Sequence, residues 1–337
     1  MTTRRNFLKN TTMLAAGLGV SPLLSSSPLR SYQKEEVING KVRIAVIGVG
    51  MGCRDLQGAL TDNPWVHCVG MCDVNKVRLE EQLARFKKDF PEQTVSIKAY
   101  TDFREVLANK EIDGVIIATP DHWHPYIFAE ALKAGKAIYV EKPVGNSISE
   151  CNAMMDFQKK YKGVVTTGLW QTSQRYFRAA NEILKSGVLG DVYKVQLWLC
   201  QSTNPRPSVE DSEAPSTLDY DMWLGPAPER PFNNSRFRGW RGFWDYGGGQ
   251  QTDWGVHWID SAFDGLKALG LCDREYPDAV FSIAYKDPAS FNETPSCQTS
   301  IFQYKNFHIE WAQQVAYLYN RNQGVAWVGS KATLVCN

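Results

Sequence analysis

Apolar and polar residues follow two different patterns along the chain, one before Gly168 and one after it. Before Gly168, short apolar runs alternate with segments of helical periodicity. The apolar runs predict strands over residues 41–50, 65–73, 95–100, 113–120, 136–143 and 163–170. The helical segments include residues 76–90 and 125–135, and the second begins with Pro125 in its first turn and ends on Gly135. This alternation predicts an N-terminal Rossmann domain built on a doubly wound parallel sheet.

After Gly168 the apolar positions recur with period two. The strand-like segments are residues 191–202, 278–286, 297–305 and 307–314. Phe307, Ile309 and Trp311 alternate with polar side chains, and Lys305-Asn306 suits a tight hairpin before them. We therefore expect an α+β domain with a large, mostly antiparallel open sheet. The final "GSKATLVCN" is also strand-like, up to Asn337.

Length and composition are those of a protein with two globular domains. The 337 residues, 43% hydrophobic and 22% charged, exceed what one ordinary core organises. We place the domains at residues 41–165 and 166–337. The net charge is +1, from 37 basic and 36 acidic side chains that are scattered along the chain. Nucleic acid and acidic membrane surfaces are therefore disfavoured as partners.

Residues 1–40 have the pattern of a targeting segment and linker. Arg4 and Arg5 precede Phe7, Leu8 and a mildly apolar run, as in a twin-arginine export signal. A membrane anchor is the competing interpretation, but the run is too short to span a bilayer and Gly and Pro residues interrupt it. We expect a periplasmic protein without a stable membrane span.

Cysteine and histidine spacing gives no sign of a disulfide framework or a metal site. The eight cysteines are spread from Cys53 to Cys336 without C-x-x-C spacing, so buried thiols are expected. Among the five histidines the closest pair is His122 and His124, and no zinc-binding pattern accompanies it. We predict no metal ligands.

A glycine motif at the end of the first predicted strand indicates a dinucleotide site. Gly48 and Gly50 occupy the first two positions of the fingerprint, and the third falls on Cys53 or, in another register, Gly52. We predict that the whole loop, Met51 included, contacts the cofactor. Asp73 ends the second strand, where a carboxylate can bind both ribose hydroxyls and would repel a 2′-phosphate. NAD is therefore expected rather than NADP; the alternative is that Asp73 is a surface turn residue.

Two further segments end predicted parallel strands, where open sheets bind their ligands. "ATPDHWHP" contains Thr119, Pro120 and His124, and "VEKPVG" contains Glu141 and Lys142. We predict that these residues line the cofactor site, with Lys142 toward the nicotinamide. Taken singly, Lys142 is equally consistent with a solvated lysine.

In the order and spacing of its motifs the chain resembles the Gfo/Idh/MocA oxidoreductase family. The matching features are Gly48-x-Gly50, Asp73, the triplet Glu141-Lys142-Pro143, "RAANEILKSGVLGDV", "DYDMWLGPAPERP" and "GGGQQTDWGVHWID". Asp253 and His257 in the last segment share a face if it is helical. The resemblance implies that Lys142 meets them, with the nicotinamide and a sugar hydroxyl between.

That arrangement suits the oxidation of an alcohol. A histidine can take the hydroxyl proton as hydride leaves carbon, so His257 is the expected base. Lys142 would stabilise the developing alkoxide, and Asp253 would orient the base or bind substrate. The alternative is a helix-capping Asp253 and a core-facing His257.

Polar and aromatic residues of the second domain are candidates for binding the substrate. Arg175 in "QTSQRYF" and Tyr246 in "RFRGWRGFWDYGGG" suit a sugar, which needs hydrogen bonds and an aromatic face. The alternative is packing between domains or subunits.

These features predict an NAD(H)-dependent oxidoreductase that acts on a sugar or polyol secondary alcohol and retains its cofactor, and a homo-oligomer formed through the C-terminal sheet. An NAD-dependent glycosidase, a non-catalytic dinucleotide- or sugar-binding protein and a purely structural partner remain as alternatives.

Overall fold

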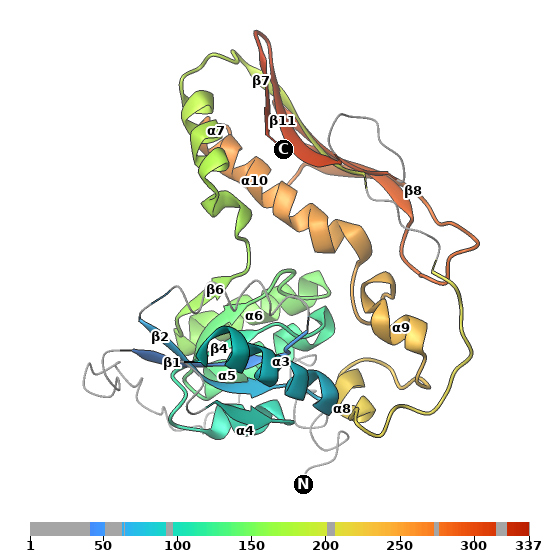
Figure 1. Cartoon of the computed structure of the whole chain (residues 1–337). Coiled ribbons are helices and arrows are strands. Elements are labelled where there is room, and N and C mark those ends of the chain that lie inside the picture. The colour runs from blue at the N-terminus through green and yellow to red at the C-terminus, as the bar shows by residue number, and fades with distance from the viewer. Residues whose placement is uncertain are drawn as a thin grey trace, which may run out of the picture. The chain divides into compact units, whose positions relative to one another are not determined.

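The computed structural model describes residues 41–50, 63, 65–91, 97–200, 206–272, 276–314 and 322–336 (Figure 1). The predicted export signal and the loop residues Met51, Gly52 and Cys53 lie outside this part. The chain forms two compact units. The first consists of residues up to Gly168 together with Ser212–Phe232, and the second of Leu169–Asp211 and Asn233–Asn337. Residues 212–232, which we predicted to lie in the second domain, thus belong to the first unit.

The first unit contains a six-stranded, wholly parallel sheet in the order β3-β2-β1-β4-β5-β6, as the sequence predicts. Its strands are β1 (Val42–Ile47), β2 (Val66–Cys72), β3 (Lys98–Tyr100), β4 (Gly114–Ile117), β5 (Ala137–Val140) and β6 (Val165–Thr167). Its helices are α3 (Lys76–Asp89), α4 (Phe103–Ala108), η4 (Asp121–Trp123), α5 (His124–Lys133), α6 (Ile148–Tyr161) and α8 (Tyr220–Leu224). Chain order reverses between β1 and β4, which is where open sheets of this kind bind nucleotides.

Apolar side chains cover both faces of this sheet. On one face Ile47 and Ile117 pack with Ile127 of α5 and residues of α4 and α6. On the other face Val46 packs with Phe86 of α3. The predicted limits of α5 are confirmed, since Pro125 lies in its first turn and Gly135, just past its end, has a φ of +70°.

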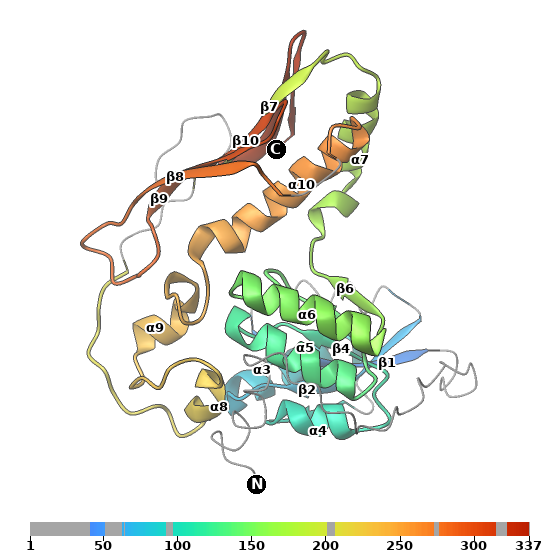
Figure 2. The ribbon, with the colours of Figure 1, turned by 180° about the vertical axis from the view of Figure 1, so that it is seen from behind.

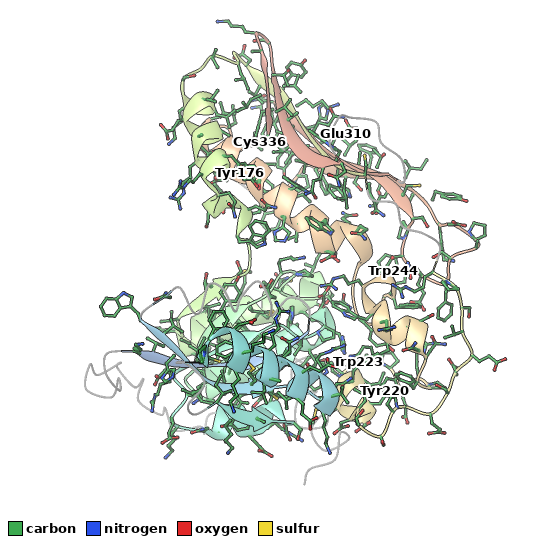
Figure 3. The ribbon with its side chains drawn as sticks, in the orientation of Figure 1. Tyr176, Tyr220, Trp223, Trp244, Glu310 and Cys336 are labelled. Atoms are coloured by element: carbon green, nitrogen blue, oxygen red, sulfur yellow. The ribbon has the colours of Figure 1, made fainter. Side chains whose placement is uncertain are left out.

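Residues 212–232 are tied to the first unit by hydrogen bonds and by aromatic packing. The Lys76 amide at the start of α3 donates to the Thr217 carbonyl over 2.9 Å. The Trp123 indole donates to the carbonyls of Met222 and Trp223, over 3.0 Å each. Trp223 also stacks on Tyr220 with ring centroids 5.7 Å apart (Figure 3). These contacts place α8 beside the first turns of α3 and α5.

The second unit contains a mixed, mostly antiparallel sheet in the order β12-β11-β7-β10-β9-β8. Only the central pair β7–β10 is parallel among the strands described. The strands are β7 (Val192–Cys200), β8 (Ala279–Tyr285), β9 (Cys297–Gln303), β10 (His308–Gln314), β11 (Gln323–Gly329) and β12 (Thr333–Cys336). The predicted hairpin at Lys305-Asn306 is confirmed, with the Tyr304 amide donating to the Phe307 carbonyl over 2.9 Å.

The second unit also contains helices and shorter helical turns. They are η5 (Gln171–Ser173), α7 (Arg175–Lys185), α9 (Asn234–Arg238), η6 (Trp240–Gly242), the π-helical turn η7 (Gln251–Gly255) and α10 (Val256–Ala268). Helices α7 and α10 run along the sheet in both views (Figures 1 and 2). Their apolar sides bury Leu197, Trp311 and Trp327, whose side chains are inaccessible to solvent.

The described residues include seven cysteines. Each described cysteine is a free thiol, and Cys68, Cys72, Cys200 and Cys336 are buried. Burial raises the pKa of the Cys68 thiol to about 12, so it is inert at neutral pH. Within these residues no cluster of potential metal ligands occurs, and no helix is long and apolar enough to cross a membrane.

Candidate active site

The turn after β1 requires glycine at its first position. Gly48 has a φ of +88°, and a Cβ atom there would lie 2.6 Å from the backbone of Ala118 at the end of β4. Any other residue would be strained and would clash with backbone that has no room to move. The turn therefore brings the end of β1 tightly against the β4 loop, as a dinucleotide-binding turn requires.

Asp73 holds this turn from the end of β2. Its two carboxylate oxygens accept hydrogen bonds from the amides of Val49 at 3.0 Å and Asn75 at 2.8 Å. The side chain is buried, so the alternative of a surface turn residue does not apply. Burial raises the pKa of Asp73, opposed by the Asn75 hydrogen bond and by the positive charge of Arg78. Each oxygen keeps a lone pair for a further donor, such as a ribose hydroxyl.

Arg78 stands beside the same site. A guanidinium nitrogen of Arg78 would be 3.8 Å from a Cβ atom built on Gly50, so the arginine reaches the second glycine of the motif. A nearby arginine is the group that accommodates a 2′-phosphate in NADP-binding relatives of this fold. Asp73 therefore favours NAD, whereas Arg78, which the sequence motifs did not point to, favours NADP.

His124 connects the turns that follow β4 and β5. Its Nδ1 atom lies 2.7 Å from the Pro143 carbonyl oxygen, and its Nε2 atom lies 2.9 Å from that of Thr119. The ring is 1% exposed. Both nitrogens therefore contact backbone carbonyls, which makes His124 a residue that positions the two turns. That His124 also binds the cofactor directly stays a prediction.

The triplet Glu141-Lys142-Pro143 follows β5 at this same edge. Gly168 leaves space for the Glu141 carboxyl group, since a Cβ atom there would overlap it. Burial, followed by the charge and hydrogen bond of Glu141, raises the pKa of Tyr139 to about 12. Lys142 is half-buried, and its bond to Pro143 is cis. The triplet is thus anchored at Glu141 and Pro143, on either side of the lysine.

The residues of this edge fit a dinucleotide. They comprise a turn with no space for a side chain at Gly48, the buried acidic residue Asp73 after β2 and the lysine Lys142 after β5. The Thr119 hydroxyl is buried and has no hydrogen-bond partner in the described part of the chain. Pro120 follows it and is half-buried before η4.

In the second unit, Asp253 and His257 lie on consecutive helical segments. Asp253 belongs to the π-helical turn η7 and His257 to the first turn of α10. Such π-turns often occur at functional sites, because they widen the helix locally. His257 is 3% exposed, and its ring contacts those of Trp170 and Trp254 edge-on, at centroid distances of 5.6 and 6.2 Å.

Asp253 forms an ion pair that sequence reasoning did not anticipate. The Nε atom of Arg241 lies 3.1 Å from Oδ1 of Asp253, and its guanidinium stacks over the Trp240 ring at 4.3 Å. Arg241 lies in "RFRGWRGFWDYGGG", from which we selected aromatic residues and no arginine. The signal that was missed is the three arginines within six residues of that stretch.

The predicted substrate residues have very different exposures. Arg175, the first residue of α7, is exposed. Tyr246 is inaccessible to solvent, so its side chain has no free surface in this structure for contact with a substrate. Lys142 belongs to the first unit and Asp253 and His257 to the second. That the three meet stays a prediction.

Curated relatives of this chain include glycosidases and dehydrogenases. Over 163 residues the chain is 33% identical to an alpha-N-acetylgalactosaminidase of Tannerella forsythia, covering 44% of this chain and 34% of that protein. It is 24% identical over 151 residues to an inositol 2-dehydrogenase of Salmonella typhimurium, covering 44% and 43%. The matched part is therefore less than half of each of these relatives.

Among solved structures, the fold matches the WlbA dehydrogenase of Bordetella pertussis in complex with NADH and UDP-GlcNAcA. The TM-score is 0.66 at 18% identity, over 88% of this chain and 79% of that one. Family models match both parts of the chain. The oxidoreductase family's NAD-binding Rossmann fold matches residues 42–169, and its C-terminal alpha/beta domain matches residues 178–267. With the glycine turn, the Glu-Lys-Pro triplet and the two-unit fold in agreement, the chain belongs to the Gfo/Idh/MocA family of oxidoreductases.

Proposed function

We propose that this protein is an NAD(H)-dependent oxidoreductase that transfers hydride between nicotinamide and a secondary alcohol of a sugar or polyol. The observation that carries the proposal is the edge of the first sheet, where Gly48, Asp73 and Lys142 follow β1, β2 and β5. The matched family models and the inositol dehydrogenase relative support it.

The bound nicotinamide supplies the hydride acceptor or donor. The protein's own residues handle the proton and the charge on oxygen. His257 takes the hydroxyl proton, and its packing between Trp170 and Trp254 keeps water away from the ring. Lys142 stabilises the developing alkoxide, and Asp253, held by Arg241, orients the base or a substrate hydroxyl.

The test combines nucleotide analysis with a substrate panel. Nucleotide released from the purified protein is identified by mass spectrometry, and absorbance of reduced cofactor is followed with neutral sugars, acidic sugars and polyols. NAD with net reduction by at least one alcohol is the expected result. Tight cofactor binding without turnover on the whole panel would favour a non-catalytic binding protein. If no nucleotide is released from the protein and added nucleotide does not bind, a structural protein is favoured.

A second candidate function is the cleavage of glycosides through transient oxidation. The identity of 33% to an alpha-N-acetylgalactosaminidase favours it. The same hydride transfer would oxidise the sugar, allow elimination of the aglycone and then be reversed. Product analysis separates the two functions, because release of free sugar without net reduction of NAD identifies the glycosidase.

We further propose export by the twin-arginine route with the cofactor already loaded. This rests on Arg4 and Arg5 and on the lack of fresh dinucleotide outside the cytoplasm. An exported enzyme would then reoxidise or rereduce the same bound nucleotide with a second substrate. Dialysed protein from the periplasmic fraction should turn over paired sugar donor and acceptor without added NAD. Protein that emerges empty and needs a continuous supply of NAD contradicts retention.

The second sheet supports assembly with a further copy of the chain. Its edge strand β8 exposes Val280, Phe281, Ile283 and Tyr285, of which Ile283 is 76% exposed. Ile301 on β9 pairs with Phe281 and extends the same apolar surface. Exposed apolar patches of this kind mark interfaces. Light scattering should find an oligomer that Ile283→Glu dissociates; a monomeric unmutated protein contradicts the assembly.

A further inference from the structure

The second unit contains a cavity of about 350 Å³ that is lined by three arginines. Arg206 precedes the link to the first unit, Arg238 ends α9, and Arg241 lies in η6. Trp240 forms part of the wall, and Asn292 and Thr294 supply an amide and a hydroxyl. The volume is at the lower end of the usual range for small-molecule sites, which is about 300–1,000 Å³.

Glycines let the polar side chains of this cavity approach the backbone. A Cβ atom on Gly239 would collide with the Arg206 guanidinium, and one on Gly242 would lie 2.5 Å from Oδ1 of Asn292. Gly249 has a φ of +69°, and a Cβ atom there would be 2.9 Å from the Thr294 side chain. The third glycine of "GGGQQTDWGVHWID" is therefore needed for the wall of this cavity.

The charge in the cavity is positive. No aspartate or glutamate is among the described lining residues. Arg241 is balanced by Asp253, which leaves the charges of Arg206 and Arg238. Arg206 donates to the Ser235 carbonyl over 3.4 Å, a contact that fixes its direction without neutralising it. Arg238 is exposed, so it can turn toward a ligand at little cost.

The cavity is connected to the candidate catalytic residues of this unit. Gly249 and Gln250 line it and lead directly into η7, the turn that carries Asp253. Arg241 contacts both the cavity and Asp253. A ligand in the cavity thus lies next to the ion partner of Asp253, without any contribution from the first unit.

We infer that this cavity binds an anionic group carried by the sugar substrate, either a carboxylate or a phosphate. Guanidinium groups recognise both through paired, charge-assisted hydrogen bonds. The Trp240 ring offers an apolar wall for the sugar ring that carries the anion. The inference rests on the proposed function and narrows its substrate class to acidic or phosphorylated sugars.

The test is calorimetric binding of matched sugars to the full-length protein with NAD present. The pairs are glucuronate with glucose, galacturonate with galactose, and glucose 6-phosphate with glucose, and inorganic phosphate is titrated alone. Either the uronates or glucose 6-phosphate should bind about tenfold more tightly than the matching neutral sugars, as expected for hydrogen bonds to a charged group. A preference for uronates identifies the carboxylate, and a preference for glucose 6-phosphate identifies the phosphate.

Two variants assign the effect to the cavity. Arg238→Gln should remove most of the preference, whereas Arg178→Gln, on the exposed side of α7, removes the same charge elsewhere and should leave it unchanged. Unfolding temperatures of both variants check that the fold is intact. Equal binding of acidic and neutral sugars, or equal losses in the two variants, overturns the inference, as does inorganic phosphate binding as tightly as glucose 6-phosphate.

Failure of the inference can be told apart from failure of the proposed function. Reduction of NAD by a neutral sugar, with no preference for acidic ones, overturns the anion site and leaves the dehydrogenase proposal standing. Preferential binding of uronates without hydride transfer supports the site and contradicts the dehydrogenase.

Discussion

Arg241 and Asp253 form an ion pair with 3.1 Å between Nε and Oδ1, although Arg241 precedes the glycine-rich stretch and Asp253 follows it. The Asp253 side chain is 16% exposed and that of Arg241 48%. The carboxylate is therefore the more protected partner. Asp253 lies in the π-helical turn η7, which leads directly into α10. The ion pair with Arg241 therefore fixes the direction of the Asp253 carboxylate relative to α10 and His257.

This relationship predicts coupled effects of substitution. Arg241→Gln and Asp253→Asn should each lower kcat on a neutral sugar, and the double variant should be little worse than Asp253→Asn. The expected coupling is about 0.5–3 kcal/mol, the range for residues in direct contact. Using a neutral sugar removes any contribution of Arg241 to anion binding. Strictly additive losses would show that Arg241 does not act through Asp253.

The sheets could be predicted because the information for them is local. Alternating strands and helices, period-two apolar residues and the Lys305-Asn306 turn each depend on neighbours within a few residues. The return of residues 212–232 to the first unit could not be found in this way. It depends on contacts such as that between the Trp123 indole and the Met222 carbonyl, which are 99 positions apart.

The candidate site was predictable to a similar extent. The residues at strand ends follow from a general rule for parallel sheets, and Gly48 and Asp73 lie where it requires. Tyr246 shows the limit, since an aromatic residue suits both a sugar and a core and here is buried. His124 was assigned to the site for its position, and only the structure shows that both ring nitrogens face backbone carbonyls.

Loss of the proposed base should affect chemistry and not cofactor binding. His257→Ala removes the imidazole, and general-base loss lowers turnover by about a hundred- to ten-thousand-fold. His257 lies in the second unit, so the affinity for NAD measured by calorimetry should change little. Turnover is measured at saturating substrate under conditions where hydride transfer limits the rate. Unchanged turnover there would remove His257 from this role.

Replacing His124 should weaken the first unit and its affinity for NAD. His124→Gln cannot reproduce both contacts to the carbonyls of Thr119 and Pro143. One lost bond to a buried group costs about 1–3 kcal/mol of unfolding free energy. Denaturant unfolding and NAD titration measure the two effects. His308→Gln on β10 is the matched control, and equal stability of the two variants would contradict a positioning role for His124.

Cofactor choice should depend on Asp73 and Arg78 together. In the unmutated protein NAD should bind more tightly than NADP, because the buried Asp73 carboxylate accepts ribose hydroxyls and repels a 2′-phosphate. Asp73→Ser should narrow the difference between the two affinities, since it removes the repulsion and leaves the positive charge of Arg78 to attract the phosphate.

Adding Arg78→Gln to Asp73→Ser should then lower the affinity for NADP and leave that for NAD nearly unchanged. Calorimetric titration of the three proteins with both nucleotides measures these affinities, with unfolding temperatures as the control for the two lost backbone contacts of Asp73. Equal affinity of the unmutated protein for NAD and NADP would contradict the assignment of Asp73, and an unchanged NADP affinity in the double variant would contradict that of Arg78.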